Sequence, residues 1–189
     1  GIDTGGLLYN KNCQTLTKTR LRRDGHCLLR YDIGQKYHFS AALANQYLTA
    51  VKKALQHADI VFIADYGKGN ITDELIVLLA EEQQVEPKII AIDSKDYDKY
   101  ACLNPDLIKP NYDEARKILS QEEEDDRLTQ ALKWPESLAA LSQANWVALT
   151  LDKDGVILSK KGGSAKHYRV PALKEGNFSG AGDTFLTVL

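Results

Sequence analysis

The chain has 189 residues, of which 43% are hydrophobic and 26% are charged, and its formal net charge is −2. This composition suits a globular domain with a hydrophobic core, and the near-neutral charge argues against a nucleic-acid partner, which usually requires a basic surplus. No apolar run approaches the roughly 20 residues of a membrane span, so no membrane partner is expected. The three cysteines, Cys13, Cys27 and Cys102, are odd in number and far apart, which favours free thiols and a cytoplasmic location.

The first part of the chain is predicted to form short strands. Residues 5–9 form a candidate strand, and the segments 16–23 and 27–33 flank Asp24-Gly25, the commonest two-residue hairpin signal. The hairpin carries Lys18, Arg20 and Arg30. Basic side chains suit an anionic substrate, although an ordinary hairpin with a solvated basic face explains them equally well.

Strands and helices then alternate, which predicts a parallel α/β sheet. Residues 39–58 carry a helical apolar stripe with Ser40 as a cap, and 59–64 is apolar enough for a buried parallel strand. Asp65-Tyr66-Gly67-Lys68-Gly69 follows at the carboxyl end of that strand, where ligands gather in open sheets. Asp65 and Lys68 are therefore candidate substrate residues, with an ordinary strand-to-helix loop as the alternative.

A second strand end also carries polar side chains. Thr72 caps a helix that extends to about residue 84, and the buried strand 88–92 ends in Asp93-Ser94-Lys95. Lys95 is placed to approach nucleotide phosphates, although a surface lysine is almost as well supported. A short strand at 107–109 precedes Asn111-Tyr112-Asp113-Glu114.

The spacing of Asn111 and Glu114 has two interpretations. Asn followed three residues later by Glu is a capping box, a structural device at many helix starts. The same pair directly after a strand end is placed for a ligand, and the two roles are compatible. The acidic run 122–126 is assigned to a solvated segment without a metal.

The last part of the chain is predicted to continue the sheet. A helix to about residue 143 is interrupted near Pro135, and strands are expected at 146–151, 156–159 and 165–170. Near the end stands Asn177-Phe178-Ser179-Gly180-Ala181-Gly182-Asp183-Thr184-Phe185. Small residues before a helix start let backbone N–H groups converge on an anion, and Asp183 supplies a carboxylate beside them. A Gly-rich turn with a dipole-favoured Asp is the structural alternative.

These segments together resemble the ribokinase-type (pfkB) carbohydrate kinases, and among them the D-glycero-β-D-manno-heptose 7-phosphate kinases. The resemblance rests on the signature around Gly180-Ala181-Gly182-Asp183 and on further stretches that occur in the family's order. These stretches are 17–21, 28–32, 65–69, 92–95, 109–114 and 147–150.

The resemblance implies a ribokinase-like fold, in which a parallel sheet with helices on both faces carries a small β lid hairpin. Residues 1–37 would supply the lid and 38–189 the nucleotide-binding part of one partial kinase domain. The family has a segment ahead of the lid and helices after Asp183, so the chain is expected to be a piece of a larger kinase.

The resemblance also assigns roles. Gly180, Ala181 and Gly182 would form the anion hole and Asp183 would be the catalytic base. ATP would contact a set of residues from several loops, and Glu114 would hold Mg²⁺ through water. That set is Lys95, Asn111, Tyr112, Asp113, Glu114, Thr150, Asp152 and Gly155. Lys18, Arg20, Asp65 and Lys68 would face the sugar.

The implied activity is transfer of the ATP γ-phosphoryl group to a sugar hydroxyl, most specifically on heptose 7-phosphate for ADP-heptose and lipopolysaccharide synthesis. Another sugar of the fructose or ribose type, or a nucleotide-binding fragment without turnover, are the alternatives. A homodimer through the lid is a further expectation. The chain departs from the family at Asn177, where Asp is usual, so dependence on a monovalent cation is in doubt.

Overall fold

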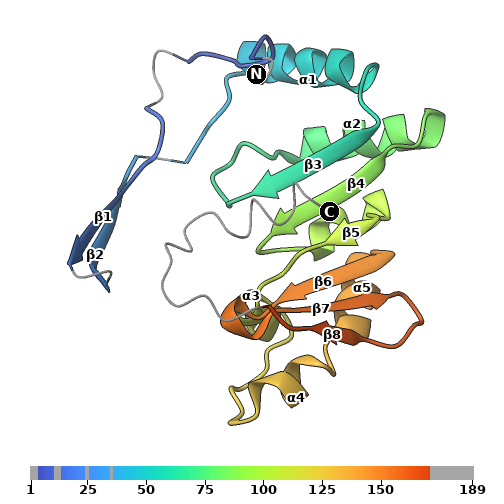
Figure 1. Ribbon diagram of the computed structural model, residues 1–189. Coiled ribbons are helices and arrows are strands. Elements are labelled where there is room, and N and C mark those ends of the chain that lie inside the picture. The colour runs from blue at the N-terminus through green and yellow to red at the C-terminus, as the bar shows by residue number, and fades with distance from the viewer. Residues whose placement is uncertain (1–3, 11–13, 24–25, 35, 171–189) are drawn as a thin grey trace.

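The computed structural model describes residues 4–10, 14–23, 26–34 and 36–170 (Figure 1). Strands β1 (Thr17–Arg23) and β2 (His26–Ile33) form the predicted antiparallel hairpin, with a bulge between Leu21 and Arg22. Residues 5–9, predicted as a strand, instead contain a turn in which Leu7 N–H donates to the Thr4 carbonyl at 3.0 Å. Their large side chains are exposed, so no apolar face anchors this segment to a sheet.

The main sheet has the order β3-β4-β5-β6-β7-β8. Its parallel part consists of β3 (Ile60–Asp65), β4 (Ile89–Ser94), β5 (Leu107–Ile108) and β6 (Trp146–Thr150). Strands β7 (Val156–Lys160) and β8 (Lys166–Tyr168) are antiparallel, because the turns before them are too short for a crossover. The predicted α/β class is confirmed as a mostly parallel mixed sheet with helices and a separate small hairpin.

The helices connect these strands, and the three that follow Ser40, Thr72 and Asn111 begin where the sequence predicts. They are α1 (Ala41–Leu55), α2 (Asp73–Val85), η1 (Asp98–Leu103), α3 (Tyr112–Ile118), α4 (Arg127–Ala131), α5 (Pro135–Ser142) and η2 (Asp152–Asp154). Ser40 and Thr72 cap α1 and α2, since each hydroxyl accepts a backbone N–H three residues ahead at 3.3 Å. Among the described helices, none has the length and apolar character that crossing a membrane requires.

The hydrophobic core lies between the sheet and the layer formed by α2, η1 and α5, which contact one another or the strands (Figure 1). Alternate residues of each strand face this layer and are buried; they are Ile63, Ile90, Ile92, Ile108, Val147 and Leu149. The prediction of a strand buried on both faces at 59–64 is wrong for the described residues. Ile60 and Phe62 are 48% and 47% exposed, because β3 ends the strand order and no described helix covers their face.

The parallel strands direct their carboxyl ends toward the side on which the hairpin stands (Figure 1). The loops after β3 and β4, the start of α3 and the segment after β6 therefore meet along one edge. Most of the residues selected from the sequence lie in these four loops. The fold thus brings together groups that are far apart in the chain.

Candidate functional site

A cavity of about 300 Å³ lies at this edge. Its lining comes from the loop after β4, from the first turns of α3 and from η2. The lining residues are Lys95, Asn111, Tyr112, Asp113, Glu114, Lys117 and Asp152. The structure therefore gathers all of the residues selected for nucleotide binding except Thr150 and Gly155.

The capping box fixes Glu114 at the wall of this cavity. Asn111 Oδ1 accepts the Glu114 N–H at 2.9 Å, and Glu114 Oε2 accepts the Asn111 N–H at 3.0 Å. This reciprocal pair confirms the structural interpretation of the Asn-x-x-Glu spacing. The same contacts leave the other carboxylate oxygen of Glu114 without a hydrogen bond from any described residue.

The surroundings of Glu114 make it a candidate for cation binding. Burial raises the pKa of Glu114, the Asn111 N–H opposes this shift, and the nearby Asp93 carboxylate adds to it. Asp93 is itself paired with the buried Lys109, whose Nζ lies 2.9 Å from Asp93 Oδ2. The charges of Lys109 and Lys95 partly oppose the shift at Glu114, so two carboxylates and two ammonium groups act on one another here.

These groups fit a magnesium ion held through water. Within the described residues no cluster of three or more His, Cys, Asp or Glu could hold a metal directly. Magnesium keeps several of its waters and needs few protein carboxylates, so a fixed Glu114 with one spare oxygen is sufficient. A nearby cation would also relieve the cost of ionising this half-buried carboxyl group.

Tyr112 supports the cavity wall from inside the core. It is 1% exposed, and its hydroxyl donates to Gln130 Oε1 at 2.5 Å. The Arg127 guanidinium lies 4.1 Å from the centre of the Tyr112 ring and pairs with Asp152 at 2.9 Å. Arg127 therefore joins the α3 side of the cavity to the η2 side, and Asp152 is held at the mouth by this contact.

Thr150 and Gly155 lie beside the cavity without lining it. The Thr150 N–H donates to the Pro110 carbonyl at 3.0 Å, which places the end of β6 next to the start of α3. Gly155 has a φ of +95°, and a Cβ there would stand 2.1 Å from the Tyr168 carbonyl oxygen. Both residues shape the backbone that carries Asp152.

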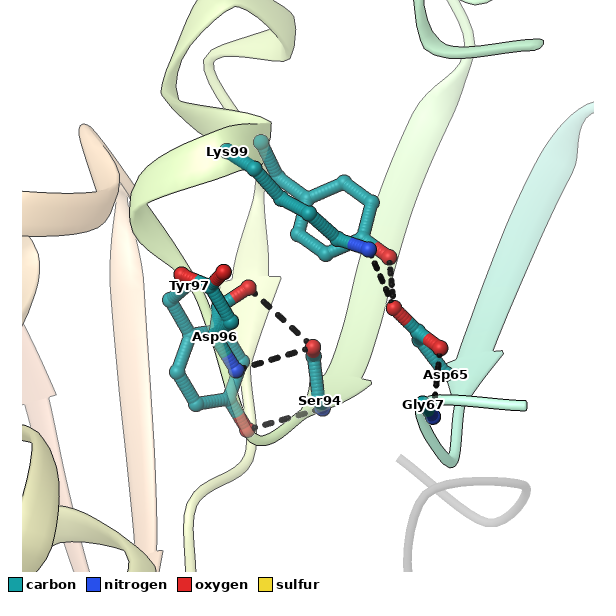
Figure 2. Close-up of polar contacts among 7 residues, drawn as sticks. Asp65, Gly67, Ser94, Asp96, Tyr97 and Lys99 are labelled. Atoms are coloured by element: carbon teal, nitrogen blue, oxygen red, sulfur yellow. Dashed lines mark hydrogen bonds and ion pairs between the residues drawn. The ribbon is translucent and has the colours of Figure 1, made fainter. Parts of the chain in front are cut away.

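The loop after β3 is tied down through Asp65 (Figure 2). The Asp65 side chain is 5% exposed, and Oδ2 accepts hydrogen bonds from Lys99 Nζ at 2.5 Å and from Tyr100 Oη at 2.7 Å. Oδ1 accepts the Gly67 N–H at 2.8 Å. Sequence reasoning selected Asp65 for the substrate, and the structure places its carboxylate within this network.

The hairpin contacts this loop through Lys18. Lys18 and Arg20 stand opposite Asp32 and Arg30, so they share one face of the hairpin. Lys18 Nζ lies 5.0 Å from the centre of the Tyr66 ring. The pKa of Asp32 is lowered chiefly by its hydrogen bond to Arg30, with smaller contributions from the charges of Lys18 and Lys68.

Lys117 was missed by sequence reasoning. It lies one turn after Asp113 and Glu114 on α3 and lines the cavity with Lys95. Neither lysine is ion-paired within the part of the chain that the structure describes. The available signal was helical spacing, since residues 113, 114 and 117 share a helix face. The predicted catalytic residues Gly180, Ala181, Gly182 and Asp183 lie outside the described residues, as does Asn177.

Comparison with solved structures shows the fold. Phosphofructokinase-2 from Escherichia coli, in complex with substrates and products, superimposes with a TM-score of 0.64 at 17% identity, covering 89% of this chain and 54% of that one. A protein described as Sa239 gives a TM-score of 0.72 at 16% identity, covering 98% and 58%. At these identities the likeness concerns architecture alone, which is the predicted ribokinase-like one.

Sequence comparison gives the family. The bifunctional protein HldE of Desulfatibacillum aliphaticivorans is 30% identical over 191 residues, which cover 100% of this chain and 38% of the relative. The chain therefore spans less than half the length of this curated relative. The pfkB family carbohydrate kinase model matches residues 1–189. The chain belongs to the pfkB family of carbohydrate kinases.

Proposed function

We propose that the protein transfers the γ-phosphoryl group of ATP to a hydroxyl of a sugar phosphate. The observation that carries this proposal is the arrangement of two charged regions along one sheet edge. A cavity with two lysines and the half-buried Glu114 lies at β4 and α3, and the hairpin face that carries Lys18 and Arg20 contacts the loop after β3 through Lys18. A nucleotide in the first region and an anionic acceptor beside the second would meet at this edge.

Each region has a defined part in the reaction. Lys95 and Lys117 neutralise the phosphates, and Asn111, Tyr112, Asp113, Asp152 and the adjoining Thr150 and Gly155 shape the nucleotide site. Magnesium, when bound, supplies charge neutralisation between the phosphates. Glu114 orients the water ligands of this ion through its spare oxygen.

We assign the reaction at the acceptor hydroxyl to the signature at residues 180–183. We assign Asp183 as the base that takes the proton from the acceptor hydroxyl. The N–H groups of Gly180, Ala181, Gly182 and Asp183 donate to the charge on the moving phosphoryl group. This division matches what phosphoryl transfer requires, since it depends on positioning and charge stabilisation.

The substrate we propose is D-glycero-β-D-manno-heptose 7-phosphate, phosphorylated at its anomeric hydroxyl to the 1,7-bisphosphate. Lys18, Arg20 and Lys68 provide positive charge for the 7-phosphate on the hairpin side. The match to a bifunctional HldE protein supports the same step in ADP-heptose and lipopolysaccharide synthesis. A cytoplasmic location suits an ATP-dependent enzyme, and Cys27 and Cys102 are free thiols.

A panel of sugars tests this proposal. The complete natural protein is incubated with MgATP and heptose 7-phosphate, fructose 6-phosphate, fructose or ribose, and ADP release is followed. Heptose 7-phosphate should give the highest kcat/KM, and Asp183→Asn should lower it by about 10²-fold or more. A loss of less than about tenfold contradicts the assignment of Asp183 as base.

The alternative acceptor is a sugar of the fructose or ribose type. The fold likeness to a phosphofructokinase favours including fructose 6-phosphate in the panel. A higher kcat/KM for fructose or ribose than for the phosphorylated sugars would show that the basic hairpin face does not select the substrate. ATP binding without any transfer would instead support a nucleotide-binding role.

We further propose that two copies associate through the hairpin. The face opposite the basic residues is apolar and exposed, with Leu21, Leu29, Tyr31 and Ile33 at 58%, 53%, 47% and 54% exposure. A two-stranded hairpin is marginally stable without cover, so this face needs a partner. In sedimentation experiments, Leu29→Glu should convert a dimer to a monomer. Leu132→Glu, at the end of α4 and away from the hairpin, should leave the dimer intact.

A further inference from the structure

One short helix braces the loops that follow two neighbouring strands. Lys99 and Tyr100 lie in η1 and hold Asp65 at the end of β3 (Figure 2). Tyr97, directly before η1, accepts the Ser94 N–H at 3.3 Å at the end of β4. The Ser94 hydroxyl also donates to the Asp96 carbonyl and accepts the Asp96 N–H, both at 3.1 Å.

The Asp65 network is well satisfied electrostatically. Burial acts to raise the pKa of Asp65, but hydrogen bonds from Lys99, Tyr100 and the Gly67 N–H outweigh burial and lower it. A buried carboxylate with three donors holds its orientation, because loss of any donor leaves it under-satisfied. Asp65 is therefore a fixed point from which the loop starts.

The loop is also fixed on its other side. Gly67 adopts a φ of +67°, with its N–H held by Asp65. The next residue, Lys68, accepts the Tyr37 N–H at 2.6 Å through its carbonyl. At Gly69 a Cβ would stand 2.5 Å from the Tyr37 carbonyl oxygen, so the backbone passes directly against this segment.

With its backbone fixed in this way, the loop directs the side chains of Lys68 and Tyr66 toward the hairpin. Lys68 influences the pKa of Asp32 on β2, and Tyr66 contacts Lys18 on β1. The second braced loop carries Lys95, which lines the nucleotide cavity. Tyr97, directly before η1, thus supports the loop that carries Lys95. Lys99 and Tyr100, within η1, support the loop that carries Lys68.

We propose that Lys99 and Tyr100 are positioning residues for the sugar phosphate: through Asp65 they set the loop that presents Lys68, while Tyr97 does the same for the loop of Lys95. This inference rests on the proposed function for the identity of the two ligands. Lys99, Tyr100 and Tyr97 touch neither ligand in it. Lys99 separates the two effects, because its ammonium group pairs with Asp65 at the end of β3, whereas the Tyr100 hydroxyl interacts both with Asp65 and with the Ser94 side chain at the end of β4.

Steady-state kinetics of the complete protein with MgATP and heptose 7-phosphate test the proposal. Lys99→Met should raise the KM for the sugar phosphate about tenfold and change the KM for ATP less than about twofold, whereas Tyr100→Phe, which also loses a contact with Ser94, should raise both. Lys99→Arg should restore most of the loss. Tyr97→Phe should show the reverse pattern, and Lys53→Met, an exposed lysine on α1, should change neither value.

Equal changes in both KM values for Lys99→Met, or no change in either, would overturn the proposal. Hydrogen exchange of the 65–69 backbone gives a readout without turnover. It should become faster in Tyr100→Phe and stay unchanged in Tyr97→Phe. Faster exchange in a protein that phosphorylates no sugar would reject the proposed function and keep the brace, whereas unchanged exchange in an active kinase would reject the brace alone.

Discussion

Asp65 and Glu114 are two carboxylates at the same edge of one sheet, and their surroundings shift their pKa values in opposite directions. Asp65 receives three hydrogen bonds, and its pKa is lowered. Glu114 is half-buried with one backbone donor and with Asp93 nearby, and its pKa is raised. The first carboxylate is used to fix a loop, whereas the second keeps binding capacity for a cation. Removing each in turn tests this contrast.

The largest expected effect is on stability at Asp65. Asp65→Ala leaves Lys99 and Tyr100 without their acceptor and should lower the free energy of unfolding by about 3 kcal/mol. Urea denaturation measures this change. Asp59→Ala, at an exposed position before β3, is the matched control and should change it by less than about 0.5 kcal/mol. A loss at Asp65 no larger than the control would show that the network does not stabilise the loop.

At Glu114 the expected effect is on binding instead. Glu114→Gln keeps an acceptor for the Asn111 N–H but loses the charge, so ATP affinity in the presence of Mg²⁺ should fall about 10- to 100-fold. Calorimetric titration of ATP with and without MgCl₂ measures this. Glu136→Gln, in the first turn of α5, should leave affinity unchanged. An equal loss without magnesium would mean that Glu114 acts through the helix cap and not through the ion.

The pH dependence of stability should separate the two groups by sign. The lowered pKa of Asp65 adds stability that is present above its ordinary value of 3.8 and is lost as the pH falls through the folded-state value. The raised pKa of Glu114 adds stability that is present below its ordinary value of 4.5 and is lost as the pH rises through the folded-state value.

Denaturation at several pH values compares the wild type with Asp65→Asn and Glu114→Gln. Relative to the wild type, the free energy of unfolding of Asp65→Asn should be lowered most at neutral pH and least in acid. The free energy of unfolding of Glu114→Gln should be higher than that of the wild type at neutral pH, and this difference should disappear in acid. Curves of the same sign for both variants would contradict the contrast between the two sites.

The smallest expected effect concerns Lys117. It is exposed on α3, so its contribution to phosphate binding should be on the order of 1 kcal/mol, or roughly a fivefold change in ATP affinity for Lys117→Gln. Lys53→Gln on α1 removes the same charge away from the cavity. Binding measured at low and high salt should show a weaker salt dependence for the first variant only. Equal behaviour of both variants would remove Lys117 from the site.

Local sequence signals predicted the parts of this edge that depend on short spacing. The Asn111 and Glu114 spacing gave both the cap and the cavity wall, and Asp24-Gly25 placed the hairpin, although this turn lies outside the described residues. The end of the strand 88–92 indicated Lys95, and family resemblance added Asp152; both line the cavity together with α3. These signals succeed because each depends on neighbours within a few residues.

Contacts between distant residues could not be predicted in this way. Asp65 and Tyr100 are separated by α2 and β4, and no sequence pattern around either residue predicts its contact with the other. Exposure of Phe62 on β3 was also missed, since apolar composition does not tell which strand ends the sheet order. Lys117 was overlooked because it follows the recognised motif by one helical turn.

The register of the hairpin has a consequence for how the sugar site forms. Arg20 stands directly across from Arg30, whose guanidinium group is already paired with Asp32 at 2.8 Å. An anion arriving between the hairpin and the sheet would act as the counterion of Arg20. The phosphorylated acceptor would then stabilise the hairpin in its position over the sugar site, whereas a neutral sugar of the same shape would not.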